Sequence, residues 1–352
     1  MPAGTSPPLR RCAPVALDIL SFVLGMVLAS MTLLDVFETV VVPGGSRASL
    51  KVARRLVWGL LPIWKAIRGR RHGLSSAFAP LVLVLCFIVW MAALALGFGL
   101  MAYAVRADFE PPLRSFFDGF YIVGSSLVTV GLAESNPFGL ARWIVLAAGF
   151  CGLAVMTMAV TYLLEVQSSI AKRDIGIIKL NTAAGEPPSA VTMLQRYASI
   201  GNSDELRGVL REGRDWCATV RQSHANHPSL IYFQSVGAGS GWPAALGALL
   251  DLALICEHFL EEQSLNGSAM LLREEGTRMA RELAGVINLT PIEVAPEELE
   301  LKQAAEQLRG TYALRPELSF QSIATQRSGY LSCVNALARH LGKAAPVLVR
   351  QD

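Results

Sequence analysis

The sequence has few charged side chains and none of the compact motifs that mark an enzyme or a metal centre. Only 17% of its 352 residues are charged, whereas 52% are hydrophobic, which is too apolar for an ordinary soluble protein of this length. Its six cysteines are scattered without a CxxC pair, which argues against a disulfide framework or a zinc site. No nucleophile, base and oxyanion group fall together in a motif. We therefore predict that the protein is not an enzyme and uses no cofactor.

Acidic residues are missing from one segment altogether. Residues 43–75 contain no acidic residue but eight basic ones, namely Arg47, Lys51, Arg54, Arg55, Lys65, Arg68, Arg70 and Arg71. Apolar residues recur among them at helical spacing, which predicts a helix over residues 47–71 that lies against anionic lipid; a solvated basic loop is the alternative. Residues 167–352 contain 18 basic and 20 acidic residues. This balance is typical of a solvated domain and not of a nucleic-acid-binding surface.

Three long apolar stretches occupy residues 14–42, 76–105 and 138–164. Each exceeds the ~20 residues that a helix needs to cross the hydrocarbon core of a membrane. The first follows Arg10 and Arg11, but it is longer than the apolar region of a secretory signal, so an uncleaved span is expected.

The basic residues of 43–75 predict the direction of the three spans. Loops rich in lysine and arginine stay in the cytoplasm. Residues 1–13 are then outside, and the chain after the third span is inside. We expect the cell (inner) membrane as the location.

Residues 113–137, between the second and third spans, read "LRSFFDGFYIVGSSLVTVGLAESNP". The piece from 116 to 128 is long enough for a short helix but too short to cross a membrane. A glycine-containing turn follows it, and Asn136-Pro137 provides a break before the third span. This order predicts a re-entrant helix and loop, which survive at membrane depth only where they line a water-filled path or are buried in protein. An amphipathic connector on the outer surface is the alternative.

Residues 76–165 resemble the pore module of the potassium-channel superfamily. The resemblance rests on the order of span, short helix, Thr129-Val130-Gly131 and span, and on the residues around this tripeptide: Phe116, Phe117, Phe120, Tyr121, Ser125, Ser126 and Glu134. It implies a homotetramer with a selectivity filter at residues 129–134. The backbone carbonyls of Thr129, Val130, Gly131 and Leu132 would surround a permeant monovalent cation, potassium first.

The sequence departs from the family pattern at two positions. Leu132 stands in place of an aromatic residue, and Ala133 in place of a second glycine. Holding alanine in left-handed geometry costs roughly 1–2 kcal/mol, so we expect an altered outer filter before Glu134.

Two further features of the apolar stretches concern gating and charge. In the third span, the resemblance implies a gating hinge at Gly152, with Met156, Val160 and Leu164 as the inner gate. Glycines such as Gly149 and Gly152 also serve close helix packing in membranes, which is the alternative. In the first span, Asp35 and Glu38 are expected to form salt bridges with the basic segment.

After a linker at 166–188, residues 189–352 predict a helical cytoplasmic domain. Its expected helices cover residues 189–201, 203–223, 243–264, 267–287, 296–310 and 321–341. The glycine-rich stretch at 237–241 has no βαβ context and is interpreted as a loop, not a nucleotide site. Cys217, His224 and His227 lack a partner set for zinc.

The predicted fold class is therefore an all-α multi-pass membrane protein with a helical cytoplasmic domain. The predicted function is a tetrameric channel that conducts cations passively under an unknown signal. A cytoplasmic protein or ligand is a candidate partner of the helical domain. The alternative is a membrane sensor or scaffold that keeps the pore fold without conducting.

Overall fold

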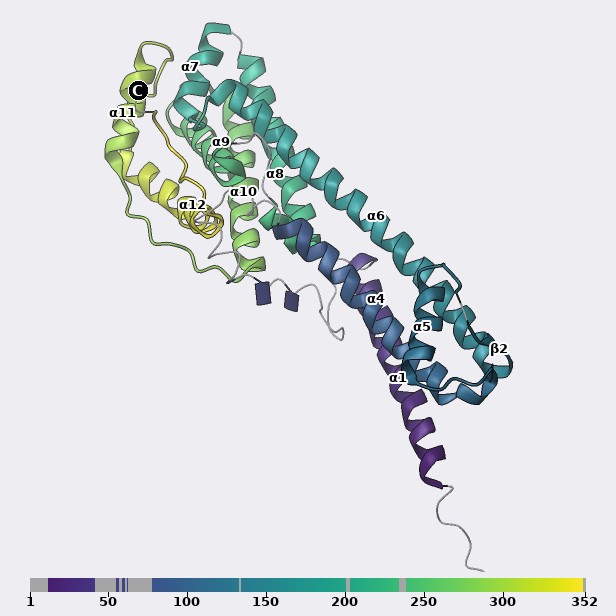
Figure 1. The fold of residues 1–352 in the computed structure, drawn as a ribbon. Helices are drawn as coiled ribbons and strands as arrows, with labels where there is room; N and C mark the ends of the chain where they lie inside the picture. The colour runs from purple at the N-terminus through teal and green to yellow at the C-terminus, as the bar shows by residue number, and fades with distance from the viewer. Residues whose placement is uncertain are drawn as a thin grey trace, which may run out of the picture. The chain divides into compact units, whose positions relative to one another are not determined.

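The computed structural model describes residues 12–41, 55–56, 59–60, 62, 78–132, 134–200, 203–233 and 239–350. Within these ranges the chain is mostly helical, with ten α-helices and one two-stranded sheet (Figure 1). The all-α prediction is thus confirmed. The chain divides into two compact units, Met1–Ala66 with Pro80–Leu164, and Ile67–Ala79 with Glu165–Asp352.

Three helices are long and apolar enough to cross a membrane, as the sequence predicts. They are α1 (Cys12–Val40), α4 (Phe78–Ala104) and α6 (Gly139–Ala184). The mean hydropathy of their most apolar windows is 2.1, 2.8 and 2.2. Helix α6 does not end with the apolar stretch but continues to Ala184, so most of the predicted linker is helical.

Small residues allow α1 and α4 to pack backbone to backbone. A Cβ atom on Gly97 would lie 2.9 Å from the Gly25 carbonyl oxygen and 3.3 Å from the Ala29 Cβ. Close packing of this kind holds helices together in membranes, because the hydrophobic effect does not drive helices together within lipid. The start of α1 is also tied to the end of α4, because both terminal nitrogens of Arg106 donate to the Asp18 carboxylate, Nη2 at 3.1 Å.

A short helix and a minimal sheet lie between α4 and α6. After the 3-10 helix η1 (Arg106–Asp108), strand β1 (Phe109–Glu110) pairs antiparallel with β2 (Asn136–Pro137). This pairing brings together the two ends of the segment that contains α5 (Phe116–Leu127). The segment between the two strands is therefore a loop that leaves and re-enters at the same place, between the apolar helices α4 and α6.

The second unit is built around one buried helix, α9 (Gly241–His258), in which every residue from Gly241 to Cys256 is buried. Around it lie the C-terminal part of α6 and the remaining elements: α7 (Ala190–Ile200), α8 (Ser203–Asn226), η2 (Pro228–Tyr232), α10 (Gln263–Val286), α11 (Glu298–Arg309) and α12 (Phe320–Leu341). All six predicted helices are present. The third ends earlier than predicted because Leu260 pairs with Leu314 and Arg315 N donates to Phe259 O at 2.8 Å.

Candidate functional site

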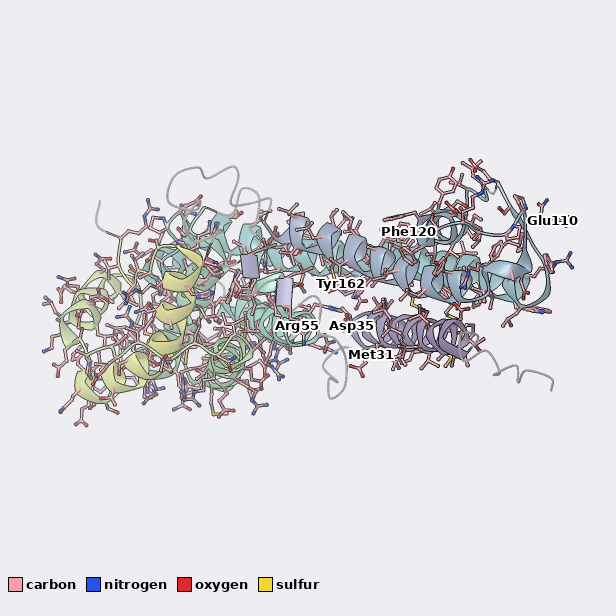
Figure 2. All side chains as sticks on the ribbon, turned by 60° about the horizontal axis from the view of Figure 1, so that its bottom comes forward. Met31, Asp35, Arg55, Glu110, Phe120 and Tyr162 are labelled. Atoms are coloured by element: carbon pink, nitrogen blue, oxygen red, sulfur yellow. The ribbon has the colours of Figure 1, made fainter. Side chains whose placement is uncertain are left out.

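The candidate site is the short helix α5 together with residues 128–132, which follow it. A capping box fixes the start of α5: the Ser115 hydroxyl accepts from Asp118 N, and Asp118 Oδ2 accepts from Ser115 N at 2.9 Å. Such boxes satisfy the free amide groups of a first helical turn. Along its length α5 packs on α4, where a Cβ on Gly99 would lie 3.2 Å from the Cα of Phe120, a residue labelled in Figure 2.

The C-terminal end of α5 is closed by its buried residue Ser125 and the neighbouring Ser126. The Ser125 carbonyl accepts from Val130 N at 2.8 Å and from Gly131 N at 3.1 Å, and the Ser126 carbonyl accepts from Thr129 N at 3.0 Å. This pattern is a Schellman motif, in which the residue after the cap adopts left-handed geometry. That residue is Thr129, with φ of 60°.

The motif determines where two of the four predicted filter oxygens point. The peptide bonds after Thr129 and Val130 are trans, so each carbonyl points opposite to the N–H of the next residue. Because Val130 N and Gly131 N both point at the Ser125 carbonyl, the Thr129 and Val130 carbonyls both point away from the end of α5. Among the described residues, none donates a hydrogen bond to either of them.

Leu132 behaves differently from these two residues. Its carbonyl oxygen accepts from the Ser125 hydroxyl at 2.7 Å, and the Ile122 carbonyl at 2.8 Å is the alternative acceptor for that proton. The fourth predicted filter oxygen is therefore turned back toward α5. The sequence marks Ser125 only as a small hydroxyl residue, and nothing in its pattern indicates this second contact.

Thr129 is held in a strained conformation. Left-handed geometry costs a residue with a Cβ roughly 1–2 kcal/mol, and it is unusual for a β-branched residue. Gly131 has φ of 70° without such a cost. Strain that the surrounding structure enforces is concentrated at functional sites in proteins, so Thr129 is the residue of this loop whose side chain most needs an explanation.

Exposed apolar side chains surround the loop. Val128, Val130 and Leu132 are 47%, 59% and 55% exposed, and Phe117 and Tyr121 on α5 are 75% and 52% exposed. Large apolar side chains exposed in this number are typical of a surface that contacts protein or lipid. Glu134 is exposed in the bend that follows, and Ala133 lies outside the described residues.

Helix α6 supports the end of α5 through its glycines. A Cβ on Gly152 would overlap the Leu127 carbonyl, whereas a Cβ on Gly149 would meet the Ser126 carbonyl at an ordinary 3.5 Å. The helix is unbroken through both positions. Gly152 thus has a packing role in this structure, and its role as a gating hinge stays a prediction.

The two carboxylates near the end of α1 are at least partly buried. Asp35, labelled in Figure 2, is fully buried. Its carboxylate accepts from Trp90 Nε1 at 2.7 Å. The Glu38 Oε2 atom is buried, and no hydrogen bond to it comes from the described part of the chain. The predicted salt bridges to residues 43–75 lie largely outside the described residues, as does the predicted interfacial helix.

The second unit contains two buried polar clusters. In the first, the fully buried Arg173 of α6 donates to the carbonyls of Leu230 and Phe233 at 3.2 and 3.0 Å. Burial, and next the charge of Arg173, lower the pKa of His224 to about 3. His227 contacts Glu165 at 3.3 Å, so both histidines have protein partners.

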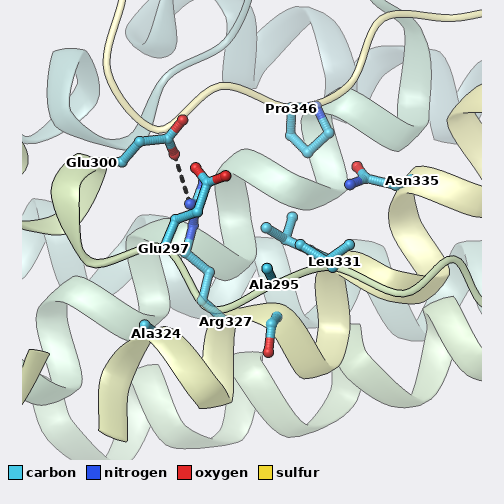
Figure 3. A pocket seen from close by; sticks show the side chains of 10 residues that line it. Ala295, Glu297, Glu300, Ala324, Arg327, Leu331, Asn335 and Pro346 are labelled. Carbon is cyan, nitrogen blue, oxygen red and sulfur yellow. Dashed lines mark hydrogen bonds and ion pairs between the residues drawn. The ribbon is translucent and has the colours of Figure 1, made fainter. Parts of the chain in front are cut away.

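In the second cluster, Arg327 joins three helices. Its Nε donates to the buried Asp251 at 2.9 Å, and its Nη1 donates to Glu300 at 2.7 Å. Tyr330 also donates to Asp251, at 2.5 Å. A pocket of about 170 Å³ adjoins Arg327, with Glu297 and Glu300 on one side and Asn335 on the other (Figure 3). This cluster could not be predicted, because its hydrogen bonds join residues 27 to 79 positions apart.

Comparison of the chain with models of protein families, with curated proteins and with solved structures gave no match.

Proposed function

We propose that four copies of this chain form a channel for monovalent cations, with potassium as the first candidate. The observation that carries the proposal is the direction of the Thr129 and Val130 carbonyls, which point away from α5 and accept no hydrogen bond from the described residues. One chain offers too few oxygens to replace the hydration shell of an ion. Four copies around an axis would offer stacked rings of carbonyl oxygens, with the Thr129 hydroxyls as an additional inner ring.

The orientation of α5 supports a cation as the permeant species. The C-terminal end of a helix carries a partial negative charge, because the dipoles of its peptide bonds are aligned along the axis. Residues 129–131 directly follow this end of α5. An ion at the Thr129 and Val130 oxygens would therefore be favoured if positive.

The exposed apolar residues of the loop and of α5 support assembly in a bilayer. We infer that Val128, Val130 and Leu132 contact neighbouring copies or lipid, because exposing so many apolar side chains to water is unfavourable. The chain would cross the inner membrane three times, with its C-terminal unit in the cytoplasm. Gly152 remains the candidate hinge, and anionic lipid the candidate partner of residues 47–71.

Ion flux into liposomes tests the proposal. The purified chain should carry potassium down a gradient, and Gly131→Val should abolish the flux because a β-branched residue does not tolerate φ of 70°. Gly124→Ala is the matched control, since Gly124 lies within α5 with nothing within 4 Å of its Cβ position. Absence of flux in wild-type protein at voltages of both signs would contradict the proposal.

One contact favours the second candidate, a non-conducting sensor or scaffold. The Ser125 hydroxyl donates a hydrogen bond to the Leu132 carbonyl oxygen. With this contact in all four copies, the filter would lack one of its oxygen rings. If this contact closes the pore, Ser125→Ala should conduct where wild type does not. Ser126→Ala is the control, because the Ser126 hydroxyl donates to Ile122 O within the helix, at 3.1 Å, and makes no contact with the loop among the described residues.

A further inference from the structure

We propose that the part of α6 beyond the membrane associates with the same segment of further copies as a parallel coiled coil. The inference rests on the proposed channel, whose subunit partner it names, and concerns a surface that we call the α6 stripe: Ser168, Ala171, Ile175, Ile178 and Thr182. All five residues are exposed. Ile175 and Ile178 are 55% and 52% exposed, which is unusual for isoleucine on a helix in water.

The spacing of the stripe is that of a heptad repeat. Successive residues are 3, 4, 3 and 4 positions apart, the a and d pattern of helices that supercoil around one another. The pattern extends back by a step of four to Leu164, at the predicted inner gate. A single-chain helix needs no such regularity on its exposed face.

The opposite face of α6 is already used within the chain. Val166, Arg173 and Ile177 are fully buried, and the Trp216 ring of α8 lies so close to Gly176 that a Cβ there would overlap it. Trp216 Nε1 also donates to the Arg173 carbonyl at 3.0 Å. The chain thus covers one face of this helix and leaves the stripe uncovered.

Lipid cannot cover the stripe. With its 46 residues, α6 is about 69 Å long at ~1.5 Å per residue, more than twice the ~30 Å of a hydrocarbon core. Ile175 follows Leu164, where the predicted span ends, by 11 residues, or about 16 Å. If α6 crosses the bilayer as far as Leu164, Ile175 lies beyond the hydrocarbon core. Outside lipid, an exposed row of apolar residues marks a contact with protein.

A second copy of α6 fits the stripe better than an unrelated partner. Isoleucine at both a (Ile175) and d (Ile178) favours assemblies of three or four helices over two. The small side chains of Ser168 and Ala171 permit close approach. In parallel register, Asp174 of one helix would lie beside Lys179 of the next, at the flanking positions where coiled coils often carry opposite charges. Within the chain, Asp174 pairs with Arg173 and Lys179 with Glu212, each at 3.1 Å, so an interhelical pair would compete with these contacts.

Disulfide trapping in native membranes tests the inference on the full chain. Cys12 and Cys151 are first changed to alanine, because the other four cysteines are buried. With Ile175→Cys, mild oxidation should link most chains into a band of twice the monomer mass. Thr219→Cys, on the exposed side of α8, is the control and should remain monomeric. A monomeric Ile175→Cys, or a band of another mass, would overturn the inference.

Flux measurements on the same membranes separate this inference from the proposed channel. Links at position 175 without potassium flux in any variant would leave the coiled coil standing and reject the channel. Flux without links would reject the coiled coil alone. Ile175→Asp with Ile178→Asp should lower the tetrameric fraction several-fold on native gels, whereas Ile175→Leu should preserve it.

Discussion

At the scale of single residues, the protein uses a helix cap as a candidate ion site. A Schellman motif normally places glycine in the left-handed position, and here Thr129 occupies it. A capping role alone gives no reason to prefer threonine over glycine. An ion-binding role does, because the threonine side chain adds a hydroxyl ligand to the carbonyl of the same residue.

Thr129→Gly separates these two roles. Glycine relieves the left-handed strain, so the free energy of unfolding should rise by roughly 1 kcal/mol. Flux should fall at the same time, because four hydroxyl ligands are lost. Thermal unfolding in detergent and potassium flux in liposomes give the two readouts. A variant that is more stable and conducts as well as wild type would show that the threonine serves no ion.

Leu132 and Ala133 are the next residues to test. Changing Leu132 to Tyr and Ala133 to Gly together should rebuild the outer filter, because glycine tolerates left-handed geometry and tyrosine restores an outward packing contact. Selectivity for potassium over sodium should rise. The reversal potential under mixed ions measures it. An unchanged potential in this variant and in Thr129→Ala would mean that ions do not pass between these residues.

The pKa of His224 predicts how the stability of the second unit depends on pH. Its pKa is about 3 when folded and ~6.5 when unfolded, so between these values the unfolded state binds more protons. The contribution of His224 to the free energy of unfolding is complete above about pH 6.5. It declines as the pH falls, by at most about 1.4 kcal/mol per pH unit. Melting temperatures from pH 7 to 5 should fall less in His224→Gln than in wild type; parallel curves would contradict this.

At the scale of elements, the helices could be predicted and their contacts could not. Apolar length identifies α1, α4 and α6, and helical periodicity identifies α7 to α12, because both signals are local. The end of α6 was misplaced, since residues 166–184 lose the apolar character of the span but not the capacity to form a helix. The carbonyl directions at Thr129 and Val130 depend on hydrogen bonds to Ser125, which no spacing reveals.

The contact between α5 and α6 gives a matched pair of variants. Gly152→Ala should push α6 away from the Leu127 carbonyl, because the added Cβ would overlap it, whereas Gly149→Ala meets Ser126 O at 3.5 Å. We expect a loss of about 1–3 kcal/mol of stability for Gly152→Ala and little change for Gly149→Ala. Thermal unfolding measures both. Equal stability of the two variants would mean that α6 bends or shifts here, in favour of the hinge.

At the scale of the whole molecule, charge is distributed along the chain in a way that predicts its orientation. Eight basic residues and no acidic residue stand between the first two apolar stretches, and such loops are retained in the cytoplasm. Three helices are long and apolar enough to cross a membrane. If all three do so, the two ends of the chain lie on opposite sides. The channel proposal depends on this orientation, since the loop at 128–132 has to open to the outside and the helical unit to the inside.

Cysteine accessibility tests the orientation without any added domain. In the Cys12→Ala and Cys151→Ala background, Ala107→Cys places a thiol at an exposed position in η1, between α4 and α5. A membrane-impermeant maleimide should label it from the periplasmic side of intact cells. Thr219→Cys on α8 should react only after the inner membrane is permeabilised. If both thiols react from the same side, the chain crosses the membrane between them an even number of times. That result would exclude α6 as a span and, with it, a pore in which α4 and α6 enclose the loop.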